Sequence, residues 1–241
     1  MGRVIMSGIV PLLSKPVKGT KVGTLAVGSS VYLMENNVRT EFLVVNQGNP
    51  DASLYDSSCD GCWLLRKDIK ENKPWDSSDN NTYSSPSAIN TWLNGKYINS
   101  LGNIEQQTIR QVKIPYVNGT GSGGSVASGV NGLSVKVFLV GGYEVGWTTS
   151  DDGYFPVDGA KLAYFESGTG TSANNKRIAK LNGEAAIWWL RSPRTDNAYG
   201  VWNILSSGKY GNGYSSYSLG IRPTLVLPST AKVDDTGLLI G

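Results

Sequence analysis

The sequence predicts an α+β domain built mainly on antiparallel sheets. Strand patterns fill both ends of the chain, and two helix patterns, in residues 83–97 and 101–111, lie between them. The regular alternation of strand and helix that a parallel sheet requires does not occur. The 241 residues are enough to bury a hydrophobic core without disulfides.

The first strand pair is expected in residues 30–48. Two β-rich runs meet there at Asn36 and Asn37, residue types that tolerate the left-handed backbone of a tight hairpin turn. Residues 62–69 have the pattern of a third strand. Residues 1–29 carry prolines and glycines around a short apolar patch, so they are interpreted as an N-terminal arm.

The segment 83–97 carries helix start and stop signals in the right order. Ser85 is the expected N-cap, Pro86 suits the first turn, and Gly95 lies just past the expected end. A second short helix is predicted for residues 101–111, where apolar residues recur at helical spacing.

The rest of the chain is predicted to consist of strands and long loops. The glycine-dense segment 118–132 is typical of a loop, and residues 150–185 are mostly irregular, with a short helix near 161–165. Further strands are expected in 111–117, 133–147 with a bulge or bend at Gly141 and Gly142, 186–193, 199–205 and 220–228.

Composition excludes several classes of function. A net charge of +3 with dispersed basic residues argues against a nucleic-acid partner. No stretch approaches the roughly 18 apolar residues of a membrane span, so no membrane insertion and no standard export signal are expected. Histidine is absent, which removes the usual base of Ser-His and Cys-His catalysis, and we expect a protein that is not an enzyme.

The remaining candidate sites each lack part of their motif. Cys59 and Cys62 have redox or zinc-knuckle spacing, but no second pair or histidine completes four ligands, so reduced thiols are favoured. Asp151, Asp152 and Asp158 are possible calcium ligands without the EF-hand spacing, and capping of turns is the alternative. No cofactor and no metal are therefore expected. Catalysis by a pair of carboxylates stays an alternative only if two of the acidic residues lie close together, which the sequence alone does not specify. The candidates are Glu144, Asp158, Glu166 and Glu184.

Residues 197–222, "NAYGVWNILSSGKYGNGYSSYSLGIR", are unusually rich in Tyr, Ser, Asn and Gly. This is the vocabulary of antibody paratopes, in which aromatic rings supply contact area and small polar residues supply adaptable hydrogen bonds. Turn and edge-strand residues are the alternative reading. The expected ligand-binding residues are Asn197, Tyr199, Trp202, Asn203, Tyr210, Asn212, Tyr214, Ser216 and Tyr217, with Trp188, Trp189, Arg191 and Arg222 as the framework beneath them.

The segments "SSPSAINTWLN", "WWLRSP" and "GIRPTLVLP" resemble an uncharacterised domain family common in gut-phage and Firmicutes genomes. In outline the chain also resembles the C-type-lectin-like variable proteins of diversity-generating retroelements, including phage tropism determinants. That resemblance implies a C-type-lectin-like domain in residues 30–230, between the arm at 1–29 and a tail at 231–241. The active-site cysteines of the enzymes with this fold are missing after Cys62.

The resemblance implies a phage or prophage protein of the receptor-binding or adhesin type, made in the host cytoplasm and mounted on a virion as a tail fibre or head decoration. The expected partners are a bacterial host-surface protein or glycan, and other virion proteins through the N-terminal arm, with the chain forming a homo-oligomer. Diversification of residues 197–222 by a retroelement is a hypothesis motivated by their composition. The alternatives are a structural virion or assembly protein without a receptor role, and a carbohydrate-active enzyme with two carboxylates.

Overall fold

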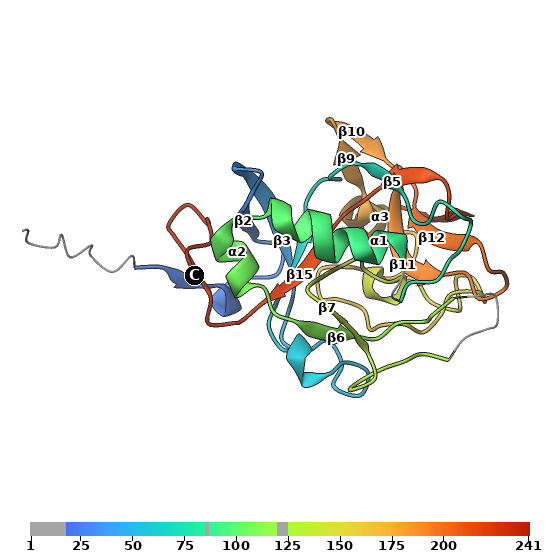
Figure 1. The fold of residues 1–241 in the computed structure, drawn as a ribbon, viewed down its shortest axis with the longest axis horizontal. Coiled ribbons are helices and arrows are strands. Elements are labelled where there is room, and N and C mark those ends of the chain that lie inside the picture. The colour runs from blue at the N-terminus through green and yellow to red at the C-terminus, as the bar shows by residue number, and fades with distance from the viewer. Residues whose placement is uncertain (1–17, 85–86, 120–124) are drawn as a thin grey trace, which may run out of the picture.

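Strands carry most of the regular structure of the protein. The computed structural model describes residues 18–84, 87–119 and 125–241, and of these 33% lie in strands and 16% in helices. The described strands form two five-stranded sheets and three two-stranded ones (Figure 1). Every helix among them is short.

The first large sheet combines three strands from the N-terminal third of the chain with β15 from near its C-terminal end and the short β8. Its neighbouring strands are all antiparallel. Asn36 and Asn37 form the β2–β3 turn with positive φ angles of 49° and 62°, so the predicted hairpin is confirmed. In order across the sheet, the strands are β2 (Ser30–Glu35), β3 (Val38–Gln47), β4 (Cys62–Arg66), β15 (Thr224–Leu227) and β8 (Val137–Phe138).

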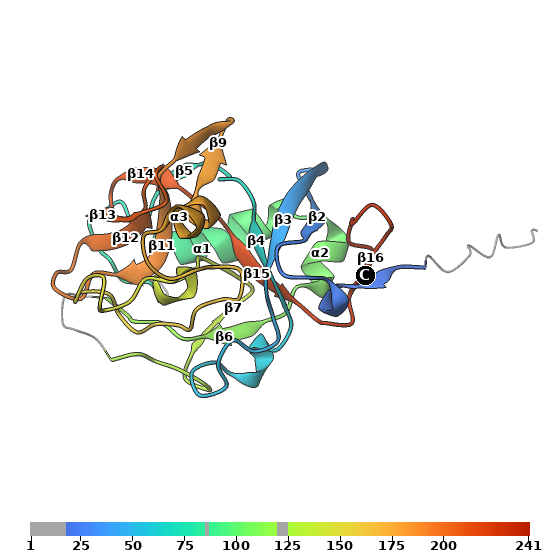
Figure 2. The same cartoon turned by 180° about the vertical axis from the view of Figure 1, so that it is seen from behind.

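The second large sheet is formed mainly by the C-terminal half of the chain. β11 pairs with β14 in parallel, whereas the other neighbours are antiparallel. Figures 1 and 2 place its β12–β13 hairpin at the end of the molecule away from the C-terminus. In order across the sheet, the strands are β13 (Tyr210–Tyr214), β12 (Gly200–Ile204), β11 (Trp188–Pro193), β14 (Ser218–Gly220) and β5 (Asn72–Pro74).

Three short strand pairs complete the described β structure. β1 (Thr20–Lys21), from the predicted arm, pairs with β16 (Lys232–Val233), from the predicted tail. Residues 1–17 of that arm lie outside the described residues. The other two pairs are β6 (Val112–Ile114) with β7 (Leu133–Val135), and β9 (Ala179–Leu181) with β10 (Glu184–Ala186).

The described helices differ from the predicted ones in their limits. The Ser87 hydroxyl accepts from the Asn90 amide at the start of α1 (Ala88–Trp92), whereas the expected cap residues Ser85 and Pro86 lie outside the described residues. Helical turns continue past Gly95 to Ser100, because this glycine keeps an ordinary φ angle and does not end the helix. α2 (Asn103–Thr108) follows directly.

One further helix was missed, and one was predicted wrongly. α3 (Thr171–Arg177) lies in the region expected to be irregular, whereas residues 161–165 form turns and no helix. None of the helices in the described ranges is both long enough and apolar enough to cross a bilayer.

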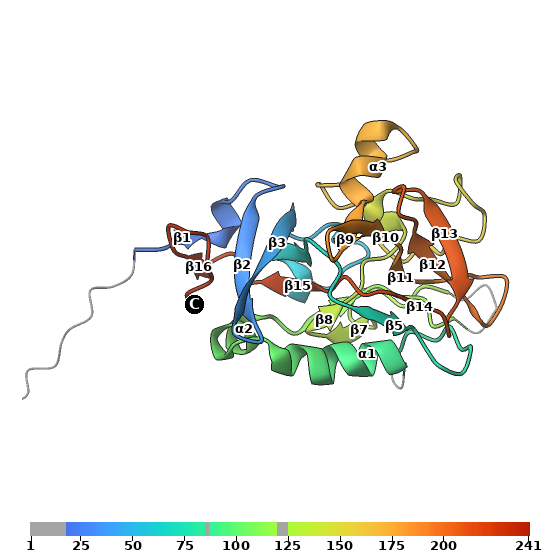
Figure 3. The ribbon, with the colours of Figure 1, turned by 90° about the horizontal axis from the view of Figure 1, so that it is seen from above.

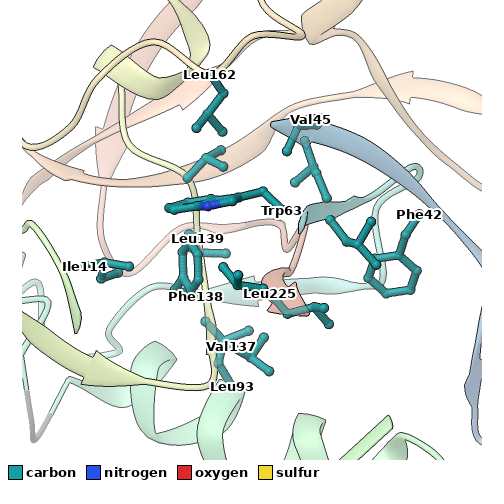
Figure 4. Packing of buried hydrophobic residues seen from close by; sticks show 14 of the residues in the cluster. Phe42, Val45, Trp63, Leu93, Ile114, Val137, Phe138, Leu139, Leu162 and Leu225 are labelled. Carbon is teal, nitrogen blue, oxygen red and sulfur yellow. The ribbon is translucent and has the colours of Figure 1, made fainter. Parts of the chain in front are cut away.

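The hydrophobic core fills the space between the sheets and helices. Trp63 on β4 has Leu162 on one side of its ring and Phe138 on the other (Figure 4). Its ring meets that of Phe138 edge to face, with centroids 5.4 Å apart, a favourable arrangement of the two ring quadrupoles. Both residues are fully buried.

The prediction of a C-type-lectin-like α+β domain is wrong. The described residues form five mostly antiparallel sheets with few, short helices. The prediction depended on the order of motifs along the chain, and that order does not specify which strands pair. The "GIRPTLVLP" segment, for example, leaves the second sheet at Gly220 and enters the first at Thr224.

Candidate ligand-binding surface

Three exposed tyrosines adjoin the β12–β13 hairpin and form what we call the tyrosine platform: Tyr199, Tyr214 and Tyr217. Their exposed fractions are 43%, 45% and 51%. The rings of Tyr199 and Tyr214 stack at 16° with centroids 4.9 Å apart, and the Tyr217 ring lies 5.4 Å from that of Tyr214. The three rings therefore form one continuous aromatic surface.

Strand register explains how β13 contributes to this surface. Tyr214 lies opposite Gly200, and Asn212 lies opposite Trp202. Because side chains alternate along a strand, Asn212 and Tyr214 share one face, and the neighbouring Gly211 and Gly213 occupy the other. A Cβ atom at Gly211 would lie 2.8 Å from Oδ1 of Asn203, so this glycine gives the buried amide room.

A hollow of about 400 Å³ adjoins the tyrosine platform. The side chains of Arg194, Asn197 and Asn212 line it together with the three tyrosines. Arg194 donates two hydrogen bonds to Asp196, of 2.8 and 2.6 Å, and this contact lowers the pKa of the Asp196 carboxyl. Aromatic faces, amides and a partly neutralised guanidinium thus meet at one site.

The loop that leads into β12 is fixed from below by Asn81, which is fully buried. Its Nδ2 atom donates to the carbonyl oxygens of Arg194, Asn197 and Gly200 at 3.3, 2.8 and 2.9 Å. Asn197 in turn accepts at Oδ1 from the amide of Gly200. Asn81 was not predicted as a site residue, because it lies more than a hundred residues from the loop that it holds.

The structure does not bring all of the predicted binding residues to this surface. Trp202 and Asn203 are buried, with exposed fractions of 0% and 2%, and therefore lie beneath it. Tyr210 is half-buried, and its hydroxyl donates to the carbonyl of Asp151. Ser216 is half-buried, and its amide donates to Asp79. The hollow is lined by the other five: Asn197, Tyr199, Asn212, Tyr214 and Tyr217.

The predicted framework arginine Arg191 lies in a fully buried ion pair with Glu144. Its two terminal nitrogens contact the carboxylate oxygens at 2.5 and 2.7 Å. It also donates to the carbonyl oxygens of Pro115, Leu139 and Asp158. A substrate has no access to carboxylates that are 0% exposed, so Glu144 and Asp158 form a structural network in this conformation.

The other framework residues are buried as well. The indole of Trp188 donates to the carbonyl of Arg177, and that of Trp189 to the carbonyl of Lys73. The Arg222 guanidinium lies over the Trp188 ring at 4.9 Å. These contacts join α3, β5 and β11 beneath the hairpin.

The remaining predicted chemistry gains no support from the geometry. Cys59 and Cys62 are unpaired and buried, and burial raises the pKa of each thiol to about 12. Asp151 and Asp152 accept hydrogen bonds from nearby backbone amides, as turn-capping residues do. No group of three or more potential metal ligands occurs in the described part of the chain.

Residues 60–229 match the family model described as Domain of unknown function (DUF6273). This match covers more than half of the chain, and the protein belongs to that family. Comparison with curated proteins and with solved structures finds no match in either set, and so identifies no C-type lectin fold.

Proposed function

We propose that this protein is a non-enzymatic recognition domain that binds a saccharide on a bacterial surface through the tyrosine platform. The exposed, stacked rings of Tyr199 and Tyr214 carry the proposal. Solvent-exposed aromatic faces suit the apolar C–H face of a sugar ring, and the amides of Asn197 and Asn212 suit its hydroxyls. A host-surface protein that presents similar groups is the alternative ligand.

The volume and rigidity of the hollow support this proposal. About 400 Å³ falls within the range of small-ligand sites. Asn81 and Asn197 already hold the adjoining loop, so binding need not order it. Because less conformational entropy is lost, more of the contact energy contributes to affinity.

The start of the described chain and the β12–β13 hairpin lie at opposite ends of the molecule, which supports a protein attached to a virion through its N-terminal arm. The described chain starts beside β1 and β16, at the end of the molecule opposite the β12–β13 hairpin (Figures 1 and 2). An N-terminal arm attached to other virion proteins would leave the tyrosine platform facing outwards. Display as a homo-oligomer would add roughly 10² to 10⁴ in apparent affinity.

The phage origin and the retroelement hypothesis depend on the resemblance and on the composition of residues 197–222. Both are tested by the neighbourhood of the gene. Tail or capsid genes would support a virion protein, and a template repeat beside a reverse transcriptase gene would support diversification. A metabolic operon would overturn the virion assignment.

The binding proposal is tested with an array of bacterial surface saccharides, followed by titration of the strongest binder. Tyr214→Ala removes the central ring and should raise Kd at least ~30-fold, equivalent to about 2 kcal/mol. Tyr32→Ala, which removes a half-buried ring from β2 on the other large sheet, is the matched control and should leave Kd unchanged. A wild-type protein that binds no saccharide on the array would overturn the proposal.

The same variant separates recognition from a purely structural virion role. Particles that carry Tyr214→Ala should assemble and fail to adsorb to cells. Failure to assemble would instead indicate that the tyrosine platform packs against a neighbouring subunit.

A further inference from the structure

A second hollow, of about 520 Å³, lies between β3 on one side and α3 with β9 on the other. Figure 3 shows these elements facing one another. We propose that this hollow binds an oxyanion, namely a phosphate group carried by a small organic molecule. The residues that support the proposal are Lys67, Lys176, Lys180 and Arg222, with Tyr164 beside them, whereas the carboxylate of Asp68 in the same lining opposes it.

The lining of this hollow has more positive than negative charge. Four of its residues are cationic and only Asp68 is anionic. Lys67 pairs with Glu41 at 2.9 Å and Lys176 with Glu166 at 2.8 Å, so these two lysines are partly neutralised at the rim. Lys180 and Arg222 make no ion pair with any residue that the structure describes. Asp68 is therefore the only lining carboxylate that faces these two cations, and the lining keeps a net positive charge.

Arg222 is the unusual member, because it is only 1% exposed. Its Nε atom donates to the carbonyl of Arg66 at 2.8 Å, whereas Nη1 has no hydrogen-bond partner. Burial lowers the pKa of this guanidinium to about 10, and the neighbouring Arg66 contributes to the lowering. A buried cation with an unused donor is costly unless an acceptor arrives.

An oxyanion would supply both of the missing interactions. Its charge would offset those of Arg222 and Lys180, and its oxygens would accept from Arg222 once Nη1, which is buried in this conformation, turns toward the hollow. The hollow is larger than a bare ion requires, which leaves room for the organic part of a phosphate monoester beside the Tyr164 ring. This site is separate from the tyrosine platform and shares no lining residue with its hollow.

Calorimetric titration at low salt with inorganic phosphate and with glucose 6-phosphate tests the proposal. Both should bind with one-to-one stoichiometry, and Kd should rise with added salt. Tighter binding of glucose 6-phosphate than of inorganic phosphate would indicate that the hollow binds a phosphate group carried by an organic molecule. Equal affinities would support the anion site but overturn the organic part of the proposal.

Two variants and one control locate the site. Lys180 is exposed, so Lys180→Gln should fold normally and raise both Kd values roughly three-fold to ten-fold. Arg222→Lys keeps the charge but loses the fork, and should weaken binding at least as much. Lys232→Gln removes the same charge from an exposed position on β16 and should change nothing.

The outcomes that contradict the proposal are distinct. No saturable binding of either compound by the folded wild-type protein would overturn it. Equal effects of Lys180→Gln and Lys232→Gln would overturn it too, because they would reflect net charge alone. Tyr214→Ala should leave phosphate binding intact, so failure of the saccharide proposal and failure of this one are separable.

Discussion

At the scale of single residues, the contact between Arg191 and Glu144 is the most consequential. Both side chains are completely buried, and the carboxylate also accepts hydrogen bonds from the Tyr55 hydroxyl and the Gly141 amide. Glu144→Gln leaves the Arg191 charge buried without its counterion, which should lower the free energy of unfolding by about 3–5 kcal/mol. Urea denaturation measures this loss.

The matched control is Glu166→Gln, at the exposed pair with Lys176. Because both partners are solvated, this change should lower the free energy of unfolding far less than Glu144→Gln does. Equal costs for the two variants would show that burial does not set the strength of the Arg191 contact.

Asp158 should make stability depend on pH in an unusual direction. Burial raises the pKa of its carboxyl from 3.8 to about 6, against the opposing effects of Arg191 and Ser192. The folded state therefore holds a proton that the unfolded state has lost. Between about pH 4 and pH 6, this group lowers the free energy of unfolding as pH rises, by up to roughly 3 kcal/mol.

Asp158→Asn removes this titration with little change in shape. Urea unfolding of both proteins at pH 4.5 and pH 7 should show the wild type losing more stability than the variant as pH rises. Groups common to both proteins cancel in the comparison. A stability difference that stays constant with pH would mean that Asp158 is ionised throughout.

At the scale of elements, α3 is attached to the turn between β12 and β13. The Arg177 side chain donates to the carbonyl of Gly208, and Gly208 has a φ of +80°. A Cβ atom there would lie 2.2 Å from the carbonyl oxygen of Asn174. Gly208→Ala should therefore reduce stability by more than ~1 kcal/mol, measured by thermal or urea unfolding.

Gly153→Ala is the control for Gly208→Ala. This glycine has an ordinary φ, and nothing lies within 4 Å of the added Cβ atom. The free energy of unfolding of the Gly153→Ala variant should differ from that of the wild type by less than about 0.5 kcal/mol. If Gly208→Ala is equally mild, the turn must be able to move away from α3.

Local sequence patterns predicted where the strands and turns lie better than they predicted which segments contact one another. The β2–β3 turn follows from two asparagines that tolerate positive φ, and β11 and β15 follow from runs of apolar residues. The support of the β12 loop by Asn81 does not follow from any local pattern, because it joins residues distant in sequence. The exposed tyrosines were predicted from composition, whereas burial of Trp202 depends on its stacking with Phe155.

At the scale of the whole molecule, the segment 60–229 that matches the family omits part of the first sheet. β2 and β3 lie before it, and β3 pairs with β4 over Phe42–Arg66 to Gln47–Cys62. Without the residues before 60, β4 becomes an edge strand, and Trp63 loses the edge-to-face contact with Tyr55, whose ring centroid lies 5.6 Å from its own. The fragment 60–229 should therefore lack a cooperative thermal transition that residues 18–241 retain.

Near-ultraviolet circular dichroism and thermal unfolding of both fragments test this expectation. The shorter fragment should give weak near-ultraviolet signals and a broad transition. A sharp transition in the fragment 60–229 would mean that the matched segment folds alone and that β2 and β3 are an addition to it.

The burial of the aromatic residues also separates two optical signals. Six of the seven tryptophans are fully buried, whereas the three tyrosines of the platform face solvent. Indole emission should therefore report chiefly on unfolding. Nitration should report on the platform once the signal of Tyr154, which is 47% exposed, is resolved from those of the three platform tyrosines. A bound saccharide would protect Tyr199, Tyr214 and Tyr217 from nitration while leaving most of the tryptophan spectrum unchanged, so occupancy and folding can be followed independently in one sample.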